Sequence, residues 1–252
     1  FDAYLFAPYK QDQLPLMVNG GVIAHEHFHS LYQHLVIDPL KDKYPDASRP
    51  SPHDDHASLK RFGISEDVLD DGSALIDANQ RTKYHSLLLH GVNEGLADVW
   101  GWIYTGDENF VGRSLSSEAI NRNLALPNYR QLFAKDLILR TMNAVSISQL
   151  GRVPYDIGTQ LARTMKTLMQ KHYSSLSDAQ VRKKMAELVI KTLPVLRDRI
   201  GSLKTDEYLS LTDVVTMMAS QIDELSADDC QFLNQLIPSS DRPTSYRCGD
   251  VQ

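Results

Sequence analysis

Apolar residues recur at helical spacing over most of the chain from residue 80 onward. Within residues 80–104, apolar side chains at positions 88, 92, 96, 99 and 103 fall on one face of a helix. Similar patterns predict further helices at residues 127–148, 155–174, 177–199, 209–224 and 226–236. The pattern of polar and apolar positions therefore predicts a mainly α-helical fold.

The first 37 residues have a different pattern. Residues 1–8 are short, aromatic-rich and partly alternating, which predicts a strand, and residues 11–17 predict a second one before Asn19 and two glycines. A helix is expected at residues 20–37, because Asn19 is a good N-cap and apolar residues surround most of the helix, as in a buried helix. We expect a small strand element in front of a helical lobe.

Residues 38–78 contain four prolines, many Asp and Ser, and few periodic apolar positions, which predicts an irregular insertion. We therefore expect residues 1–252 to form one domain, with strands and helix at 1–37, the insertion at 38–78 and a helical lobe at 79–252. Residue 1 is not Met and falls within a predicted strand, so the chain is expected to be part of a longer precursor.

The charge and hydropathy of the chain argue against nucleic acid and a membrane span. The chain is 42% hydrophobic and 23% charged, as in ordinary globular proteins, with a net charge of -6. No run of Lys and Arg is present, which argues against nucleic acid as a partner. No apolar stretch approaches the length of a membrane span.

The strongest chemical motif is His25-Glu26-x-x-His29, within the helix predicted at residues 20–37. Residues four apart share a helix face, so His25 and His29 can present two imidazoles to one metal ion. Glu26 is rotated by about 100° from His25, which places its carboxylate beside the metal as a general base for a bound water. The motif therefore predicts a zinc site with a base next to it.

A catalytic zinc usually has three protein ligands, and Glu94 is the best candidate for the third. Asp98 lies one helical turn later, where it can accept the free ring N–H of a ligand histidine and fix its orientation. His90 is an alternative ligand one turn before Glu94. His34 is about half a turn away from the face of His25 and His29, so it cannot share their metal.

These two segments, His25-Glu26-x-x-His29 and Asn93-Glu94-Gly-Leu-Ala-Asp98, resemble the gluzincin metallopeptidases, especially their thermolysin-like and fungalysin-like branches. The resemblance implies a zincin-type catalytic domain that hydrolyses peptides or proteins. It covers about 25 residues around each motif. The 64 residues between His29 and Glu94 exceed the spacing of these families, and we attribute the excess to the insertion at 38–78.

The resemblance extends to the substrate site. Tyr155, before Ile157-Gly158, stands where fungalysin-like enzymes have a histidine that stabilises the oxyanion, and a phenol can donate the same hydrogen bond. The pair His172 and Tyr173 is a second candidate. Asp2, Ala3 and Tyr4 would form the edge strand along which the substrate pairs its backbone.

Two further features concern ions and location. Acidic residues at 67, 70, 71 and 77 surround Gly72 without EF-hand spacing, so they suit a plain acidic turn or, as thermolysin-like enzymes often hold calcium, a Ca²⁺ site. Cys230 and Cys248 could form a disulfide near the C-terminus or remain two buried thiols. We favour the disulfide, and with it a secreted or cell-envelope protein.

The leading hypothesis is a zinc-dependent peptidase in which Glu26 is the general base, and substitution of Glu26 tests it most directly. The alternative is a non-catalytic binding or scaffold domain in which zinc is structural or vestigial. The long gap before Glu94 supports this alternative, and the presence of Glu26 argues against it, since a purely structural zinc site needs no base.

Overall fold

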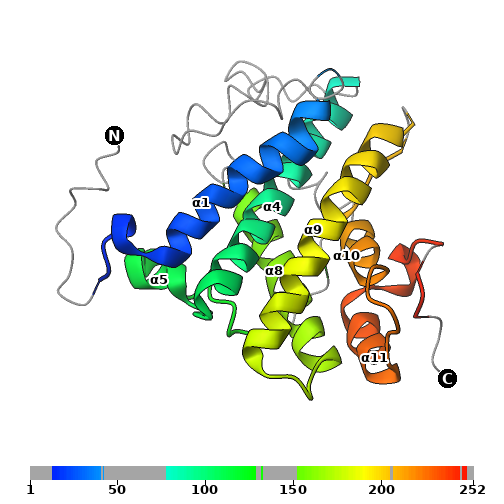
Figure 1. Cartoon of the computed structure of the whole chain (residues 1–252). Coiled ribbons are helices and arrows are strands. Elements are labelled where there is room, and N and C mark those ends of the chain that lie inside the picture. The colour runs from blue at the N-terminus through cyan, green and yellow to red at the C-terminus, as the bar shows by residue number, and fades with distance from the viewer. Residues whose placement is uncertain are drawn as a thin grey trace.

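The computed structural model describes residues 13–40, 42, 78–128, 132, 152–204, 207–244 and 246–248, and for residues 78–83 only the backbone. Over these residues the protein is mainly helical, which confirms the predicted class (Figure 1). The described α-helices are α1 (Gly20–Tyr32), α4 (Ala78–Thr105), α5 (Phe110–Ser114), α8 (Val153–His172), α9 (Asp178–Ser202), α10 (Leu211–Ala219) and α11 (Ala227–Leu236). Shorter turns of helix are η2 (Leu16–Val18), η3 (Gln33–Ile37), η4 (Asp38–Leu40), η6 (Ser116–Glu118) and η7 (Ser239–Asp241).

The predicted N-terminal strand element is absent from the described residues. The strand expected at residues 11–17 is wrong over residues 13–17, where a 3-10 turn, η2, begins directly after Pro15. Proline has no N–H to donate to a sheet, and the Leu14 N–H instead bonds the carbonyl of Arg113 at 2.8 Å. The strand expected at residues 1–8 lies outside the described residues.

Six of the seven predicted helices are observed in the described part of the chain, with shifted ends. The helix expected at residues 20–37 is α-helical only to Tyr32 and continues as the π-helical η3. The helix expected at residues 209–224 is shorter, because α10 ends at Ala219. Of the helix expected at 127–148, only residues 127, 128 and 132 are described, and they are not helical. Most of the predicted insertion, residues 41 and 43–77, also lies outside the described part.

The start of α1 is fixed by Asn19, as the sequence suggested. Its side-chain oxygen accepts hydrogen bonds from the backbone N–H groups of Gly21 and Val22, at 3.0 and 3.3 Å. Its side-chain amide also donates to the Phe110 carbonyl at 2.7 Å and to the Ser114 hydroxyl at 2.8 Å. One buried side chain therefore begins the helix and ties it to α5.

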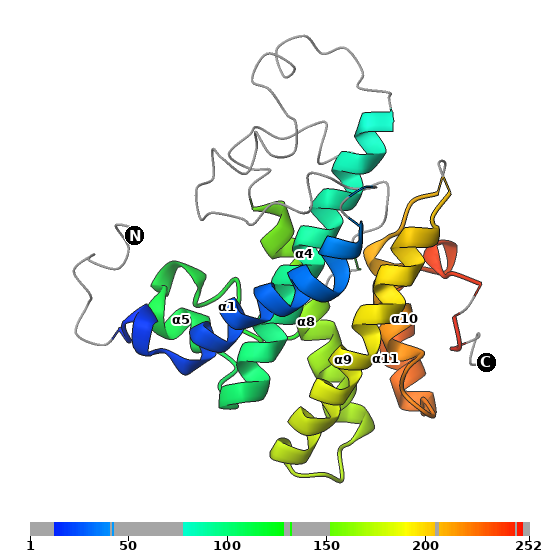
Figure 2. The same cartoon turned by 45° about the horizontal axis from the view of Figure 1, so that its top comes forward.

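Helix α4 is the centre of the packing. It lies between α1 and α8, while α10 and α11 pack against α8 and α9 on the side away from α1 (Figures 1 and 2). The apolar face predicted within residues 80–104 is buried in this core. Leu88, Val92, Leu96 and Val99 are buried, and Ile103 is partly buried against them.

Two glycines allow α4 and α8 to approach closely. A Cβ atom on Gly95 would lie 2.4 Å from the Gly158 carbonyl oxygen, and a Cβ on Gly158 would lie 2.7 Å from the Gly95 nitrogen. The two backbones therefore touch where any side chain would separate them. This crossing brings the start of α8, including Tyr155, towards Glu94.

Helix α1 is less buried than its apolar composition suggested. Phe28 and Tyr32 are fully buried, but Ile23 is 54% exposed. The expectation of a helix buried on most sides is wrong at this position, because α1 packs on α4 with one face rather than lying inside the bundle. No helix in the described part of the chain is long and apolar enough to cross a membrane.

The C-terminal end of the bundle is held by polar and covalent contacts. Cys230 in α11 forms a disulfide with Cys248. Next to it, Asp229 caps the start of α11 together with Ser226 and lies 2.8 Å from Nδ1 of His172 at the end of α8. These contacts join α8, α11 and the segment that follows them.

Candidate metal centre

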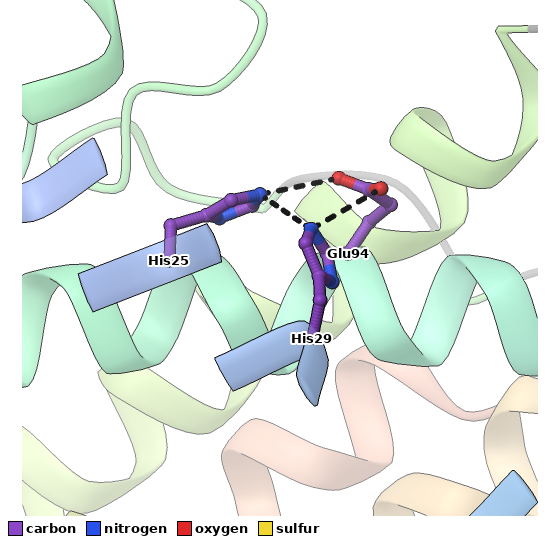
Figure 3. A group of neighbouring side chains, drawn as sticks. All are labelled: His25, His29 and Glu94. Carbon is purple, nitrogen blue, oxygen red and sulfur yellow. Dashed lines mark hydrogen bonds and ion pairs between the residues drawn. The ribbon is translucent and has the colours of Figure 1, made fainter. Parts of the chain in front are cut away.

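His25, His29 and Glu94 come together between α1 and α4. The two helices run antiparallel, so that His25 lies opposite Asp98, and His29 lies opposite Asn93 and Glu94. Figure 3 shows the two imidazoles and the carboxylate pointing towards one another. In the part of the chain that the structure describes, this is the only group of three His, Cys, Asp or Glu side chains that could hold a metal ion.

The distances between the three donor groups suit one metal ion. Nε2 of His25 and Nε2 of His29 are 3.0 Å apart, and they lie 3.5 and 3.7 Å from the two carboxylate oxygens of Glu94. Ligands at about 2.0–2.1 Å from a tetrahedral zinc ion are about 3.4 Å apart. Two imidazoles and one carboxylate are also the ligand types of a catalytic zinc site, so the residues fit this ion.

Each candidate ligand histidine has an orienting partner on α4. Oδ1 of Asp98 lies 3.1 Å from Nδ1 of His25, and Oδ1 of Asn93 lies 3.1 Å from Nδ1 of His29. In this tautomer, Nδ1 donates its proton to the partner and Nε2 keeps a free lone pair for the metal. The motif on α4 thus supplies one candidate ligand and two orienting groups.

A largely buried arginine, with 10% of its side chain exposed, completes this cluster. Arg122 lies in the turn that follows η6, and its Nη2 and Nε donate to the two oxygens of Asp98 at 2.6 and 3.1 Å. Nη2 is also 3.4 Å from Oε2 of Glu94 and 3.3 Å from Nε2 of His25. One guanidinium therefore partly balances the charge of two buried carboxylates.

These contacts shift the pKa values of the buried groups. Burial alone would lower the pKa of His25, but Asp98 and Glu94 favour its charged form and raise that pKa to about 9. Burial alone would raise the pKa of Glu94, yet its contacts with His25 and His90 and the charge of Arg122 hold it well below the ordinary value. The pKa of Asp98 is lowered for the same reasons, chiefly by the Arg122 charge against the effect of burial.

The pKa of His29 moves in the opposite direction. Burial lowers it, and this outweighs the Glu94 carboxylate, which favours protonation. At neutral pH, and with no metal bound, His25 is therefore the protonated histidine of the pair and His29 the neutral one. A metal ion must displace a proton from His25 to bind there, which links metal affinity to pH.

Glu26 and Tyr155 lie at the edges of this centre. Glu26 is exposed on α1 and near enough for its charge to favour the protonated form of His29. Tyr155 is half-buried, and its ring lies 5.2 Å from the guanidinium carbon of Arg122 and 6.5 Å from the ring of His90. His90 itself lies 3.4 Å from Oε1 of Glu94. All three residues border the site, while the three candidate ligands form its centre.

Other residues considered from the sequence are elsewhere. The side chain of His34 is 81% exposed and faces Asp38. His172 and Tyr173 lie at the opposite end of α8 from Tyr155, about 25 Å away at 1.5 Å per residue. The predicted substrate strand at Asp2, Ala3 and Tyr4 and the acidic turn around Gly72 lie outside the described residues.

Two members of the site were not predicted from the sequence. Asn93 belongs to the motif around Glu94, and no role was predicted for it, although an amide beside a ligand can orient a histidine. Arg122 lies in a polar turn, 24 residues beyond Asp98, where no periodicity or motif distinguishes it from a surface arginine. Only folding brings it to the carboxylates. Comparison of this chain with protein-family models, curated proteins and solved structures found no match.

Proposed function

We propose that this protein is a zinc-dependent peptidase of the gluzincin type, in which His25, His29 and Glu94 hold the metal. The observation that carries the proposal is that three donor groups from two helices converge, with 3.0–3.7 Å between their donor atoms. The exposed carboxylate of Glu26 lies beside them. Its substrate would be a peptide or protein. The disulfide between Cys230 and Cys248 supports a secreted or cell-envelope location.

Zinc in such a site makes a water molecule acidic near neutral pH and polarises a substrate carbonyl. Glu26 is the group that would accept a proton from the attacking water and transfer it to the leaving amine. It suits this role because it is adjacent to His25 in sequence and remains exposed, whereas Glu94 is buried as a ligand. The two glutamates thus have different environments and different roles.

The surrounding residues would hold the ligands and receive the developing charge. Asp98 and Asn93 fix the two imidazoles, and Arg122 holds Asp98 in place with two hydrogen bonds. Tyr155 could donate its phenol proton to the oxyanion from the start of α8, and the close crossing at Gly95 and Gly158 supports its placement near Glu94.

The test is Glu26→Gln, assayed on a mixed peptide library with and without a chelator. We expect the variant to keep its zinc and to lose peptidase activity by about 100- to 10,000-fold, the usual contribution of a general base. Glu187→Gln, an exposed glutamate on α9 that pairs with Lys184, is the matched control and should retain full activity.

Absence of zinc from the purified protein, together with full activity of Glu26→Gln, would contradict the proposal. A non-catalytic zinc domain predicts a different result. There, Glu26→Gln leaves function intact while His25→Ala unfolds the protein.

A further inference from the structure

One arginine on α8 holds the turn that carries Arg122. Nε of Arg163 donates to the Asn123 carbonyl at 2.9 Å, and its Nη2 donates to the carbonyls of Ile120 and Asn121 at 2.8 and 3.1 Å. These three carbonyls lie on both sides of Arg122. A single guanidinium therefore fixes the backbone of the turn before and after the residue that enters the metal centre.

Apart from the side chain of Arg122 itself, the described backbone hydrogen bonds of this turn are local or hold only its end. The Arg122 N–H bonds the Glu118 carbonyl at 2.9 Å within the turn itself, and the Leu124 N–H bonds the Glu108 carbonyl at 2.8 Å. The first contact is local and the second holds only the end of the turn. Among the described hydrogen bonds, those of Arg163 are the ones that tie the backbone of residues 120–123 to α8, whereas Tyr155 on the same helix contacts the guanidinium of Arg122.

Arg122 needs this precision because its hydrogen bonds are specific. Two of its nitrogens match the two oxygens of Asp98, and a displacement of about 1 Å would break the shorter bond of 2.6 Å or the longer one of 3.1 Å. Asp98 in turn orients His25 at 3.1 Å. The position of the turn is therefore transmitted to a candidate metal ligand by two further contacts.

We propose that Arg163 is a positioning residue for the metal centre, acting through Arg122 and Asp98 on His25. The inference rests on the proposed function, since it assigns a role towards the same site. Arg163 forms no ion pair with any residue that the structure describes, and its donors go to backbone carbonyls instead. The Asp98 carboxylate is near enough to favour the charged form of Arg163. Arg163→Lys keeps the charge and therefore isolates the geometric contribution, in which a lysine should not replace the arginine.

The experiment compares Arg163→Met and Arg163→Lys with Arg182→Met. Arg182 is a matched control, because it also donates from a long helix, α9, to a backbone carbonyl, that of Ile103 at 3.0 Å, but outside the metal centre. Zinc affinity is measured by competition with a chromogenic chelator, and the cobalt-substituted proteins are compared by their visible absorption spectra. Thermal unfolding of each variant establishes that it is folded.

We expect both Arg163 variants to bind zinc about tenfold more weakly, the lower end of the usual cost of removing supporting hydrogen bonds, with an altered cobalt spectrum. Arg182→Met should bind zinc as the unchanged protein does. In an Arg122→Met background, Arg163→Met should cause no further loss, since its effect passes through Arg122. Wild-type affinity in Arg163→Lys, or additive losses in the double variant, would overturn the proposal.

A metal-free measurement separates this inference from the proposed function. In chelator-treated protein, the Nε–H of Arg122 bonds Asp98 and should give a resolved, slowly exchanging signal in nitrogen-15 NMR spectra. This signal should be lost in Arg163→Met and Arg163→Lys and kept in Arg182→Met. If it persists in both Arg163 variants, the positioning role is wrong. If the unchanged protein binds no zinc, the proposed function fails and the NMR result still decides the role of Arg163.

Discussion

Two histidine–carboxylate pairs with buried carboxylates lie at different places in this protein. His25 pairs with Asp98 between α1 and α4, and His172 pairs with Asp229 between the ends of α8 and α11. Both carboxylates are almost fully buried, at 2% and 1% exposure. By residue type and distance alone, the two pairs are nearly equivalent.

Their surroundings differ. Asp229 also accepts hydrogen bonds from the backbone N–H and the hydroxyl of Ser226, both at 2.8 Å, so its role is explained by capping α11. Asp98 caps no helix, and the groups around it come from distant parts of the chain: His25 from α1 and Arg122 from a turn beyond α5. Convergence of donor atoms from several elements therefore distinguishes a candidate site from a structural pair.

The largest expected difference between the two pairs is in metal binding. His25→Ala should weaken zinc affinity by more than about 100-fold, since loss of an orienting partner alone costs about 10- to 100-fold and, under the proposed function, this variant loses a metal ligand. His172→Ala should leave zinc affinity unchanged and lower only the stability of the protein. Chelator competition measures the first effect and urea unfolding the second. Equal zinc affinity in the two variants would remove the distinction between the pairs.

The pair of His25 and Asp98 should also make the stability of the protein depend on pH. In metal-free protein the pKa of His25 is about 9, above its value of about 6.5 in the unfolded chain. The folded state then binds the extra proton, so its stabilisation is complete below pH 6.5 and is lost as the pH rises through 9. We expect a loss of about 3 kcal/mol in the free energy of unfolding between pH 6.5 and 9.5.

His25→Gln isolates this contribution, because the variant lacks the titrating imidazole. Urea unfolding at several pH values, in the presence of a chelator, gives the difference between the two proteins. An identical pH profile for both would show that the carboxylates do not hold a proton on His25.

Substitution of the two carboxylates, Asp98 and Asp229, should affect zinc affinity in the same way as substitution of their partner histidines. Asp98→Asn should weaken zinc affinity about 10- to 100-fold, because an amide cannot favour the donating tautomer of His25 as a carboxylate does. Asp229→Asn should leave zinc affinity unchanged, while the weakened helix cap lowers stability by about 1 kcal/mol. Chelator competition and thermal unfolding of both variants give the comparison, and a loss of zinc affinity in Asp229→Asn would contradict it.

The last prediction concerns stability at the helix crossing near the candidate metal centre. Gly95→Ala should destabilise the protein by about 1–3 kcal/mol, since its Cβ would lie 2.4 Å from the Gly158 carbonyl oxygen and the helices must separate. Gly201→Ala is the control, because its Cβ would meet only a Leu40 methyl group at 3.6 Å, and it should be neutral or slightly stabilising. Urea unfolding measures both, and equal stability of the two variants would show that the crossing is not tightly packed.

Much of the fold could be predicted from local patterns. The apolar stripe of α4 and the cap at Asn19 were visible in the sequence, because both depend on residues within a few turns of one another. The end of α1 at Tyr32 and the 3-10 turn at Leu16–Val18 were not predicted, since they depend on packing and on the absence of a partner strand among the described residues. The helix at residues 20–37 was predicted to be buried on most sides, but Ile23 is exposed, because the sequence does not show which side of α1 has a neighbour.

By itself the sequence determined where most helices form, and it contained the His25-Glu26-x-x-His29 motif and the second motif at Glu94. Each of these features depends only on residues spaced within one helix. Tertiary structure decided how the two motifs meet. The antiparallel packing of α1 on α4 places His25 beside Asp98 and His29 beside Asn93, across 64 or more residues of chain. It also brought in Arg122 and its support from Arg163, which no local pattern indicates, because the contacts that define them exist only after the turn has docked onto α8.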